Sequence, residues 1–351
     1  MAKIDDLMGQ GLSLHQSGRI AEAQAIYARV LAKEPSHPAA NHLTGLAFLQ
    51  RGDSAAAVRH LQRAVRVRGN DPEYLASLGT ALNAAGRPEE ALEAFDKSLK
   101  LQPNNPAALN NKAMALKALY RHDDAIVAYR AAIALRPHES GFYRNLANTL
   151  SELGDWHGAE RAYRDALAHR DNVPNALTGL VYTLEALQRK DEAIEIASSY
   201  AANYPGESEY HRALGHARWT AGNPEAAAAA YRAAIAANPR DVEAHRMLGS
   251  IVPRASEHDP ELAAVRQLLD DKSLSEDQRA QLEFTLGTAL ADMGEDARAL
   301  EHFSRGNAHI RTLRPFDLEA ARSEIEALRR DAPELTDLPP LLPPTGPIFI
   351  V

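Results

Sequence analysis

Polar, charged and aromatic residues recur in this sequence at intervals of 34 residues, at three equivalent places. They supply the amide, guanidinium, carboxylate and ring groups with which protein surfaces hold polypeptides. The first place carries Asn110, Arg144 and Arg212, the second Met114, Asn148, Tyr182 and His216, and the third Lys117, Ser151, Glu185 and Trp219. Asn111 and Asn145 form a further pair with the same spacing. If the structure repeats with this period, these residues share one surface.

Other chemistry has less support in the sequence. Of the fourteen histidines, no two are four residues apart, the spacing that places two metal ligands on one face of a helix. His211 and His245 are one period apart, which packing explains, so we expect no metal site. We find no glycine-rich phosphate loop, His-Glu-x-x-His helix, nucleophile elbow or paired-carboxylate motif, and we therefore assign no catalytic residue.

A basic cluster occurs in the segment "RHLQRAVRVRG", which contains Arg59, Arg63, Arg66 and Arg68. Cations are favoured near the C-terminus of a helix, where the helix dipole is negative. The chain as a whole is acidic, with a formal net charge of -8. We therefore interpret the cluster as a solvated helix end rather than a nucleic-acid site.

Composition restricts the environment of the chain. Cysteine is absent, which excludes disulfides, thiolate zinc sites and cysteine nucleophiles and favours the cytoplasm. Asp5 and Asp6 lie where a signal peptide would carry its apolar core. No apolar run is long enough to span a bilayer, so we expect no membrane insertion.

The elements that must position these residues follow from the period itself. Segments such as "GRPEEALEAFDKSLKLQP" and "GNPEAAAAAYRAAIAANP" predict two antiparallel helices per repeat. Small residues recur where the helix backbones must approach, and larger side chains, including Phe95 and Tyr231, follow the second-helix alanines by four positions as core between one repeat and the next. Prolines, including Pro103 and Pro239, end the second helices.

Two departures from the pattern are visible. The sixth repeat has Ala197 in place of the ring and Tyr200 in place of a small residue, which predicts a changed tilt toward the seventh. The period also breaks after residue 252. We expect seven repeats and the first helix of an eighth at 1–252, an irregular helical connector at 253–279, a further helix pair with a capping helix at 280–332, and a proline-rich linker at 333–345.

These quoted segments resemble the tetratricopeptide repeat. The resemblance implies an all-α fold, a right-handed superhelix with an irregular helical cap and a short strand-like tail at its C-terminal end. It also implies a concave groove, lined by the first helices, that holds a protein or peptide, or a glycan. In that groove would lie Asn110, Asn111, Lys117, Arg144, Asn145, Asn148, Tyr182, Glu185, Arg212, His216 and Trp219. The alternative is an ordinary hydrated surface. Trp219 is the strongest candidate, because an exposed indole adds little to solubility.

Two more specific resemblances concern the same surface. Asn111 and Asn145 fall where the superhelix of the protein O-linked N-acetylglucosamine transferase presents its peptide-gripping asparagines, which leaves a glycosyltransferase partnership as one alternative. Arg144 and Asn148 match two positions of the carboxylate clamp of tetratricopeptide cochaperones. Gly179, Glu209 and Ala213 occupy the other three positions of that clamp, so the clamp interpretation fails.

The order of segments, closing on "PIFIV", resembles the N-terminal part of bacterial tetratricopeptide-repeat sulfotransferases. The resemblance implies that residues 346–351 begin an α/β domain whose next residues would bind 3′-phosphoadenosine 5′-phosphosulfate. We therefore expect this chain to need no cofactor and to be no enzyme by itself, but the substrate-recruiting part of a sulfotransferase. The alternatives are a freestanding interaction scaffold, or an apolar tail packed on the last helix.

Overall fold

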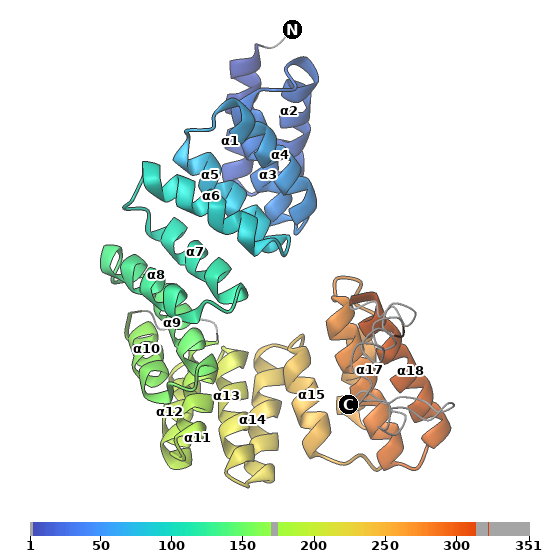
Figure 1. Cartoon of the computed structure of the whole chain (residues 1–351). Helices are drawn as coiled ribbons and strands as arrows, with labels where there is room; N and C mark the ends of the chain where they lie inside the picture. The colour runs from blue at the N-terminus through green and yellow to red at the C-terminus, as the bar shows by residue number, and fades with distance from the viewer. Residues whose placement is uncertain (1–2, 170–174, 314–321, 323–351) are drawn as a thin grey trace. The chain divides into compact units, whose positions relative to one another are not determined.

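The computed structural model describes residues 3–169, 175–313 and 322 (Figure 1). The chain divides into an N-terminal unit, which ends at Ala237, and a C-terminal unit, which begins at Asn238. The described residues form α-helices joined by short turns, as the sequence predicted. The predicted linker at 333–345 and strand at 346–351 lie outside the described residues, as does nearly all of the predicted capping helix.

The N-terminal unit consists of seven helix pairs. The first helices of the pairs are α1 (Ile4–Gln16), α3 (Pro38–Gln50), α5 (Pro72–Ala84), α7 (Pro106–Ala118), α9 (Ser140–Glu152), α11 (Ala176–Ala186) and α13 (Ser208–Thr220). The second helices are α2 (Ile20–Lys33), α4 (Ser54–Val67), α6 (Pro88–Leu101), α8 (His122–Leu135), α10 (Trp156–His169), α12 (Lys190–Asn203) and α14 (Pro224–Ala237). The two helices of each pair pack on one another, and successive pairs of the unit pack together, so each repeat is stabilised mainly by its neighbours.

Glycine allows the two helices of a pair to approach closely. A Cβ added to Gly79 would lie 2.8 Å from the ring of Phe95, and one added to Gly215 would lie 2.8 Å from the ring of Tyr231. In both cases the ring comes from the second helix of the same repeat. The ring of Tyr163 instead contacts Gly179 on the first helix of the next repeat. The predicted packing between repeats is therefore found at Tyr163, and Phe95 shares a buried cluster with Ala108 and Ala115 of the next repeat.

The sixth repeat fills its core differently. Val181 occupies the position at which neighbouring repeats have Gly or Ala, and Ala197 occupies the position of the missing ring. Both side chains are fully buried, so a larger residue on the first helix compensates for a smaller one on the second. Tyr200 packs edge-on against Tyr210 of the seventh repeat, with ring centroids 5.4 Å apart. The changed tilt stays a prediction.

The turns between paired helices require one residue in the left-handed backbone region. Glycine occupies this position in five of the seven repeats, for example Gly86 with φ 70° and Gly154 with φ 76°. Tyr120 and Gln188 fill the same position with φ values of 57° and 61°, although a side chain with a Cβ disfavours this conformation. Tyr120 is 86% exposed, so its ring gains little packing in return.

A hydrogen bond recurs where one repeat meets the next. The Nε2 atoms of His211 and His245 each lie 3.0 Å from the carbonyl oxygen of the proline six residues earlier, which follows the preceding second helix. Tyr143 donates its hydroxyl proton to the equivalent carbonyl at 3.0 Å, and Asn41 donates an amide proton at 2.9 Å. The periodic histidines thus bind the backbone at these junctions, in line with the packing interpretation.

The C-terminal unit contains α15 (Val242–Ile251), α16 (Pro260–Leu269), α17 (Glu276–Asp292) and α18 (Asp296–Leu313). Helix α15 has no second helix of its own and packs on α17, where a Cβ on Gly249 would lie 2.7 Å from the Thr285 methyl group. Helix α17 also pairs with α18, where Gly287 faces the ring of Phe303. One helix therefore serves two pairs.

Helix α15, which the sequence counts with the array that ends at residue 252, shares a core with α16 and α17. The two compact units divide between Ala237 and Asn238. The predicted capping box is present, with the Ser275 side chain accepting from the Gln278 backbone and the Gln278 side chain accepting from Ser275. In the connector, the buried Arg254 guanidinium lies 3.0 Å from Asp259 and 2.5 Å from Glu261.

Candidate functional site

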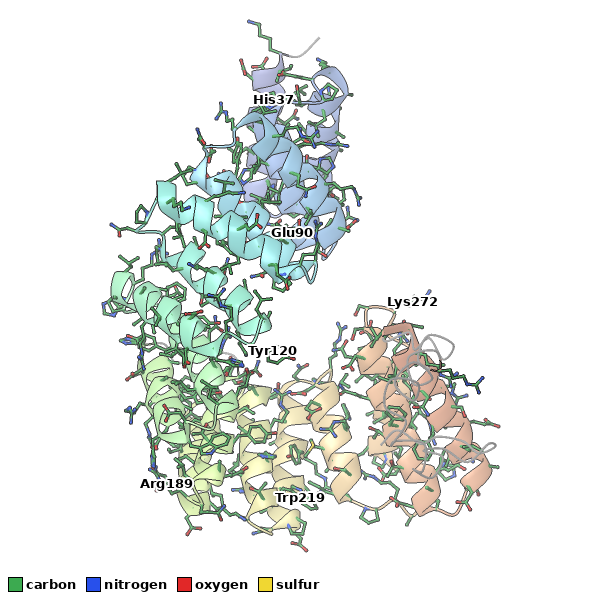
Figure 2. The ribbon with its side chains drawn as sticks, in the orientation of Figure 1. His37, Glu90, Tyr120, Arg189, Trp219 and Lys272 are labelled. Atoms are coloured by element: carbon green, nitrogen blue, oxygen red, sulfur yellow. The ribbon has the colours of Figure 1, made fainter. Side chains whose placement is uncertain are left out.

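The predicted groove residues lie on four first helices, α7, α9, α11 and α13 (Figure 1). Figure 2 labels one of them, Trp219. Each of these helices contacts the next first helix in the series. Turn-by-turn periodicity brings every third or fourth residue to the same side of a helix, so equivalent positions of successive helices form rows. We call the surface carrying these rows the first-helix face.

Asparagine amides connect the first helices across this face. Asn111 donates to the Thr80 hydroxyl on α5 at 3.1 Å, and Asn110 donates to the Asn111 side-chain oxygen at 3.1 Å. Asn145 on α9 donates to the Asn110 oxygen at 2.9 Å, and Arg144 donates to the Asn145 oxygen at 3.3 Å. The result is a continuous hydrogen-bonded chain over three helices, which we call the amide ladder.

The amide ladder changes the interpretation of its asparagines. Asn110, predicted to face a ligand, is only 8% exposed and uses its amide between α7 and α9. Asn111 and Asn145 are half-buried and bonded in the same way. A buried amide is stable only when its groups are paired, so these residues fix the spacing of neighbouring helices. Asn111 and Asn145 lie at the position suggested by the glycosyltransferase superhelix, but their side-chain amides are already hydrogen-bonded within the array.

Charged residues gather beside the end of the amide ladder. Glu209, on the first turn of α13, accepts a hydrogen bond from the backbone N–H of Asn175, just before α11. Burial raises the pKa of the Glu209 carboxyl, although this backbone bond and the charges of Arg212 and Arg144 oppose the rise. The positive charges of Arg144 on α9 and Arg212 on α13 therefore both stabilise the charged form of the Glu209 carboxyl, which also binds the backbone before α11. This carboxyl thus links the first helices of three repeats.

Two further predicted residues have partners within the array. The Lys117 ammonium lies 2.7 Å from the Glu152 carboxylate, which bridges α7 and α9. Asn148 accepts a hydrogen bond of 2.6 Å from the Tyr163 hydroxyl, the ring of which packs in the core. Ser151 is half-buried on α9. Lys117 and Asn148 therefore stabilise the face, and a ligand would have to compete for their polar groups.

The aromatic end of the face combines exposed rings with a largely buried acid. The rings of Tyr182 and His216 lie 4.1 Å apart across α11 and α13. Glu185 is bonded to His216 Nε2 at 3.1 Å and accepts from the Thr220 hydroxyl at 2.5 Å. These bonds fix the imidazole beneath Tyr182 and so restrict the positions of both rings.

Apolar surface is available at this end. Trp219 is 42% exposed and Tyr182 is 52% exposed, on the adjacent first helices α13 and α11. At the opposite end of the face, Met114 on α7 is 47% exposed. The predicted exposure of Trp219 is confirmed, while its role in binding stays a prediction. Large aromatic groups that remain exposed on a fixed backbone are typical anchors of protein contacts.

Sequence reasoning missed three contributors. Thr220 and Glu209 help to position the face, and Thr178 lies at the position of Asn110, Arg144 and Arg212 with a buried, unpartnered hydroxyl. Thr178 could have been found, because it lies at the same 34-residue spacing. Glu209 was identified only as a mismatch to the cochaperone clamp, since its acceptor role depends on the backbone conformation of Asn175.

Stacked helix pairs with a polar and aromatic first-helix face define a helical-repeat scaffold of the kind that binds other proteins. The chain belongs to the tetratricopeptide repeat family. Its repeat model matches residues 8–74, 76–140, 144–208 and 212–276, which together make up most of the chain. No curated protein matches the chain.

The chain is similar to several solved structures, and the likeness to PilW supports the fold. PilW, a widely conserved type IV pilus biogenesis factor, is 18% identical, with a TM-score of 0.55 over 60% of this chain and 98% of PilW. PilF of Pseudomonas aeruginosa is 18% identical, with a TM-score of 0.49 over 59% of this chain and 94% of PilF. YrrB, described as having an unusual peptide-binding site, is 19% identical, with a TM-score of 0.42 over 49% of this chain and 88% of YrrB. Among the described residues, no helix combines the length and apolar character that a bilayer crossing requires.

Proposed function

We propose that the first-helix face of α7 to α13 binds an extended segment of a partner protein. The observation that carries this proposal is the pair of exposed rings, Tyr182 and Trp219, on two adjacent first helices. Tetratricopeptide arrays are scaffolds for protein–protein interaction, and this face has the aromatic anchors and polar surroundings that such contacts use.

The arrangement favours a peptide over a flat protein surface. Tyr182 packs on His216, and a hydrogen bond to Glu185 orients the His216 imidazole. The Tyr182 ring is therefore held in place by its neighbours. Rings held in this way lose little conformational freedom on binding. A peptide side chain can pack on Tyr182 or Trp219 while its backbone follows the row of first helices toward Arg144.

A random peptide library displayed on phage and selected against the full chain tests the proposal. Peptides enriched on the wild type should bind Trp219→Ala about 30-fold more weakly, the equivalent of roughly 2 kcal/mol. Trp156→Ala is the matched control, because Trp156 is also exposed but lies on the second helix α10. Equal loss in both variants, or an unfolded Trp219→Ala protein, would reject this face as the site.

A second candidate function rests on the sequence alone. The order of segments and the closing "PIFIV" support a role as the recruiting part of a cytoplasmic sulfotransferase, with 3′-phosphoadenosine 5′-phosphosulfate bound by a following domain. Reading the gene beyond codon 351 tests this: a G-x-P-R-S-G-T sequence supports it, and any other continuation rejects it. The isolated chain is then expected not to bind the sulfate donor in calorimetric titration.

A further inference from the structure

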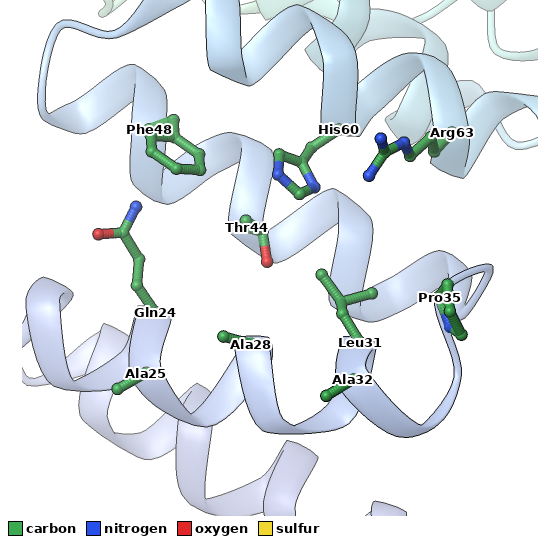
Figure 3. A pocket seen from close by; sticks show the side chains of 10 residues that line it. All are labelled: Gln24, Ala25, Ala28, Leu31, Ala32, Pro35, Thr44, Phe48, His60 and Arg63. Atoms are coloured by element: carbon green, nitrogen blue, oxygen red, sulfur yellow. The ribbon is translucent and has the colours of Figure 1, made fainter.

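A second surface of the N-terminal unit has the features of a binding site. A groove of about 560 Å³ lies between α2 and α4, with α3 as its floor (Figure 3). Ala25, Ala28 and Leu31 of α2 form one wall. On the other side, the rings of Phe48 and His60 stack with centroids 5.6 Å apart. The groove lies outside the first-helix face, so the inference drawn from it does not depend on the proposed function.

One side chain at the floor of the groove is smaller than its counterpart in most later repeats. Thr44 lies at the floor, in a position where four later repeats of the unit place a buried leucine: Leu78, Leu146, Leu180 and Leu214. The remaining later repeat has Lys112 at this position, and there a cavity of about 300 Å³ is also found. At that second cavity Lys112 crosses to Asp96 at 2.7 Å, whereas Thr44 is too short to cross its groove.

Two polar atoms beside the groove have no partner. Thr44 is 6% exposed and its hydroxyl, which Figure 3 shows directed toward α2, makes no hydrogen bond. Thr80 and Thr149, also within first helices, donate to the carbonyl four residues earlier at 3.0 Å. The Gln24 side chain accepts from Arg51 at 2.6 Å, but its Nε2 atom is buried and unpartnered. Unpaired buried donors favour an incoming acceptor.

The rim of the groove is basic. Arg63 lines it, and Arg59 and Arg66 lie four residues before and three after, on the same side of α4. Within the described part of the chain, none of these arginines pairs with a carboxylate, although the chain is acidic overall. Burial, and then the charges of Arg63 and Arg59, lower the pKa of the His60 imidazole. The field at this rim therefore attracts negative charge.

We infer that the groove between α2 and α4 binds an acidic peptide through a single leucine-like side chain. The anchor occupies the volume that the repeat's own leucine fills elsewhere and contacts Ala28, Leu31 and Phe48. Acidic residues on either side of the anchor face Arg59 and Arg63. A backbone carbonyl of the peptide accepts a hydrogen bond from the Gln24 side-chain amide.

The test uses the full chain and two fluorescein-labelled peptides, EDELEDE and its alanine form EDEAEDE, in fluorescence anisotropy. The leucine peptide should bind at least about tenfold more tightly, because burying a leucine side chain is worth that factor or more. Thr44→Leu fills the groove and should raise Tm. In this variant the leucine peptide should bind only as tightly as the alanine peptide binds the wild type. A raised Tm shows that the variant is folded, so a loss of binding would show that the peptide binds in the groove.

Charge reversal gives the second arm of the test. Arg63→Glu should weaken binding of EDELEDE about tenfold or more, whereas Arg161→Glu, the same charge change on the exposed side of α10, should leave it unchanged. No binding of EDELEDE, equal binding of both peptides, or binding that Thr44→Leu leaves intact would overturn the inference. Salt-sensitive binding of duplex DNA through the arginines, or a dimer that Thr44→Leu disrupts, would assign the surface to another occupant and also overturn it.

Discussion

The left-handed turn residue at Tyr120 allows a test of backbone strain. The repeat requires a left-handed residue after each first helix, and glycine supplies it at most of these turns. Because the Tyr120 ring is almost fully exposed, its removal changes packing little. We therefore compare Tyr120→Gly with Tyr120→Ala, two variants that lack the ring and differ only at the Cβ atom.

The expected difference follows from two opposing contributions. A Cβ in the left-handed region costs about 1–2 kcal/mol. Glycine loses about 0.4–1 kcal/mol more than alanine when the chain is ordered. Tyr120→Gly should therefore be more stable than Tyr120→Ala by about 1 kcal/mol. Val127, an exposed residue inside α8, provides the control site: there glycine should be less stable than alanine by about 1 kcal/mol.

Native-state hydrogen exchange on the amides of α7 and α8 is the appropriate assay, because a repeat array opens locally and does not unfold in two states. The sign of the glycine–alanine difference should reverse between Tyr120 and Val127. If glycine is the less stable residue at both sites, the turn at Tyr120 does not carry the strain that its φ of 57° implies, and the reasoning is wrong.

Three further predictions concern buried groups. Burial raises the pKa of Glu209, so its charge destabilises the fold at neutral pH; Glu209→Gln should raise Tm at pH 7, with no gain below the unfolded-state pKa of about 4.3. Burial raises the pKa of Tyr27 and Tyr210 to about 12, so stability should fall as pH rises from about 10 to 12; ionisation of both near pH 10 in the folded protein, seen by tyrosinate absorbance, would contradict this. Gly79→Ala should lower Tm through its contact with Phe95, and Gly9→Ala, with open space around it, should raise it.

Local features of this fold could be predicted from the sequence because residues 34 positions apart occupy equivalent places in successive repeats. Gly79 and Gly215 are small where a ring must pack, and the structure shows those contacts. His211 and His245 were interpreted as packing residues, and both bind the carbonyl of a preceding proline. The exposure of Trp219 followed from the polar character of its row.

Other features depend on contacts that a period does not encode. Asn110 was placed on the surface, but its amide is buried because Asn145 on the neighbouring helix bonds to it. The place of α15 depends on α17, a helix that begins 25 residues beyond the end of α15. The α2–α4 groove was not predicted, although Thr44 among the leucines of its row was a signal in the sequence.

The shared helix α17 has a mechanical consequence. If the chain were pulled from both ends, the N-terminal unit could extend one repeat at a time, in steps of roughly 110–120 Å for 34 residues at full extension. Helices α15 and α18 both pack on α17, so neither can detach as part of a separate pair. The C-terminal unit should therefore resist force as a whole and yield in a single larger step.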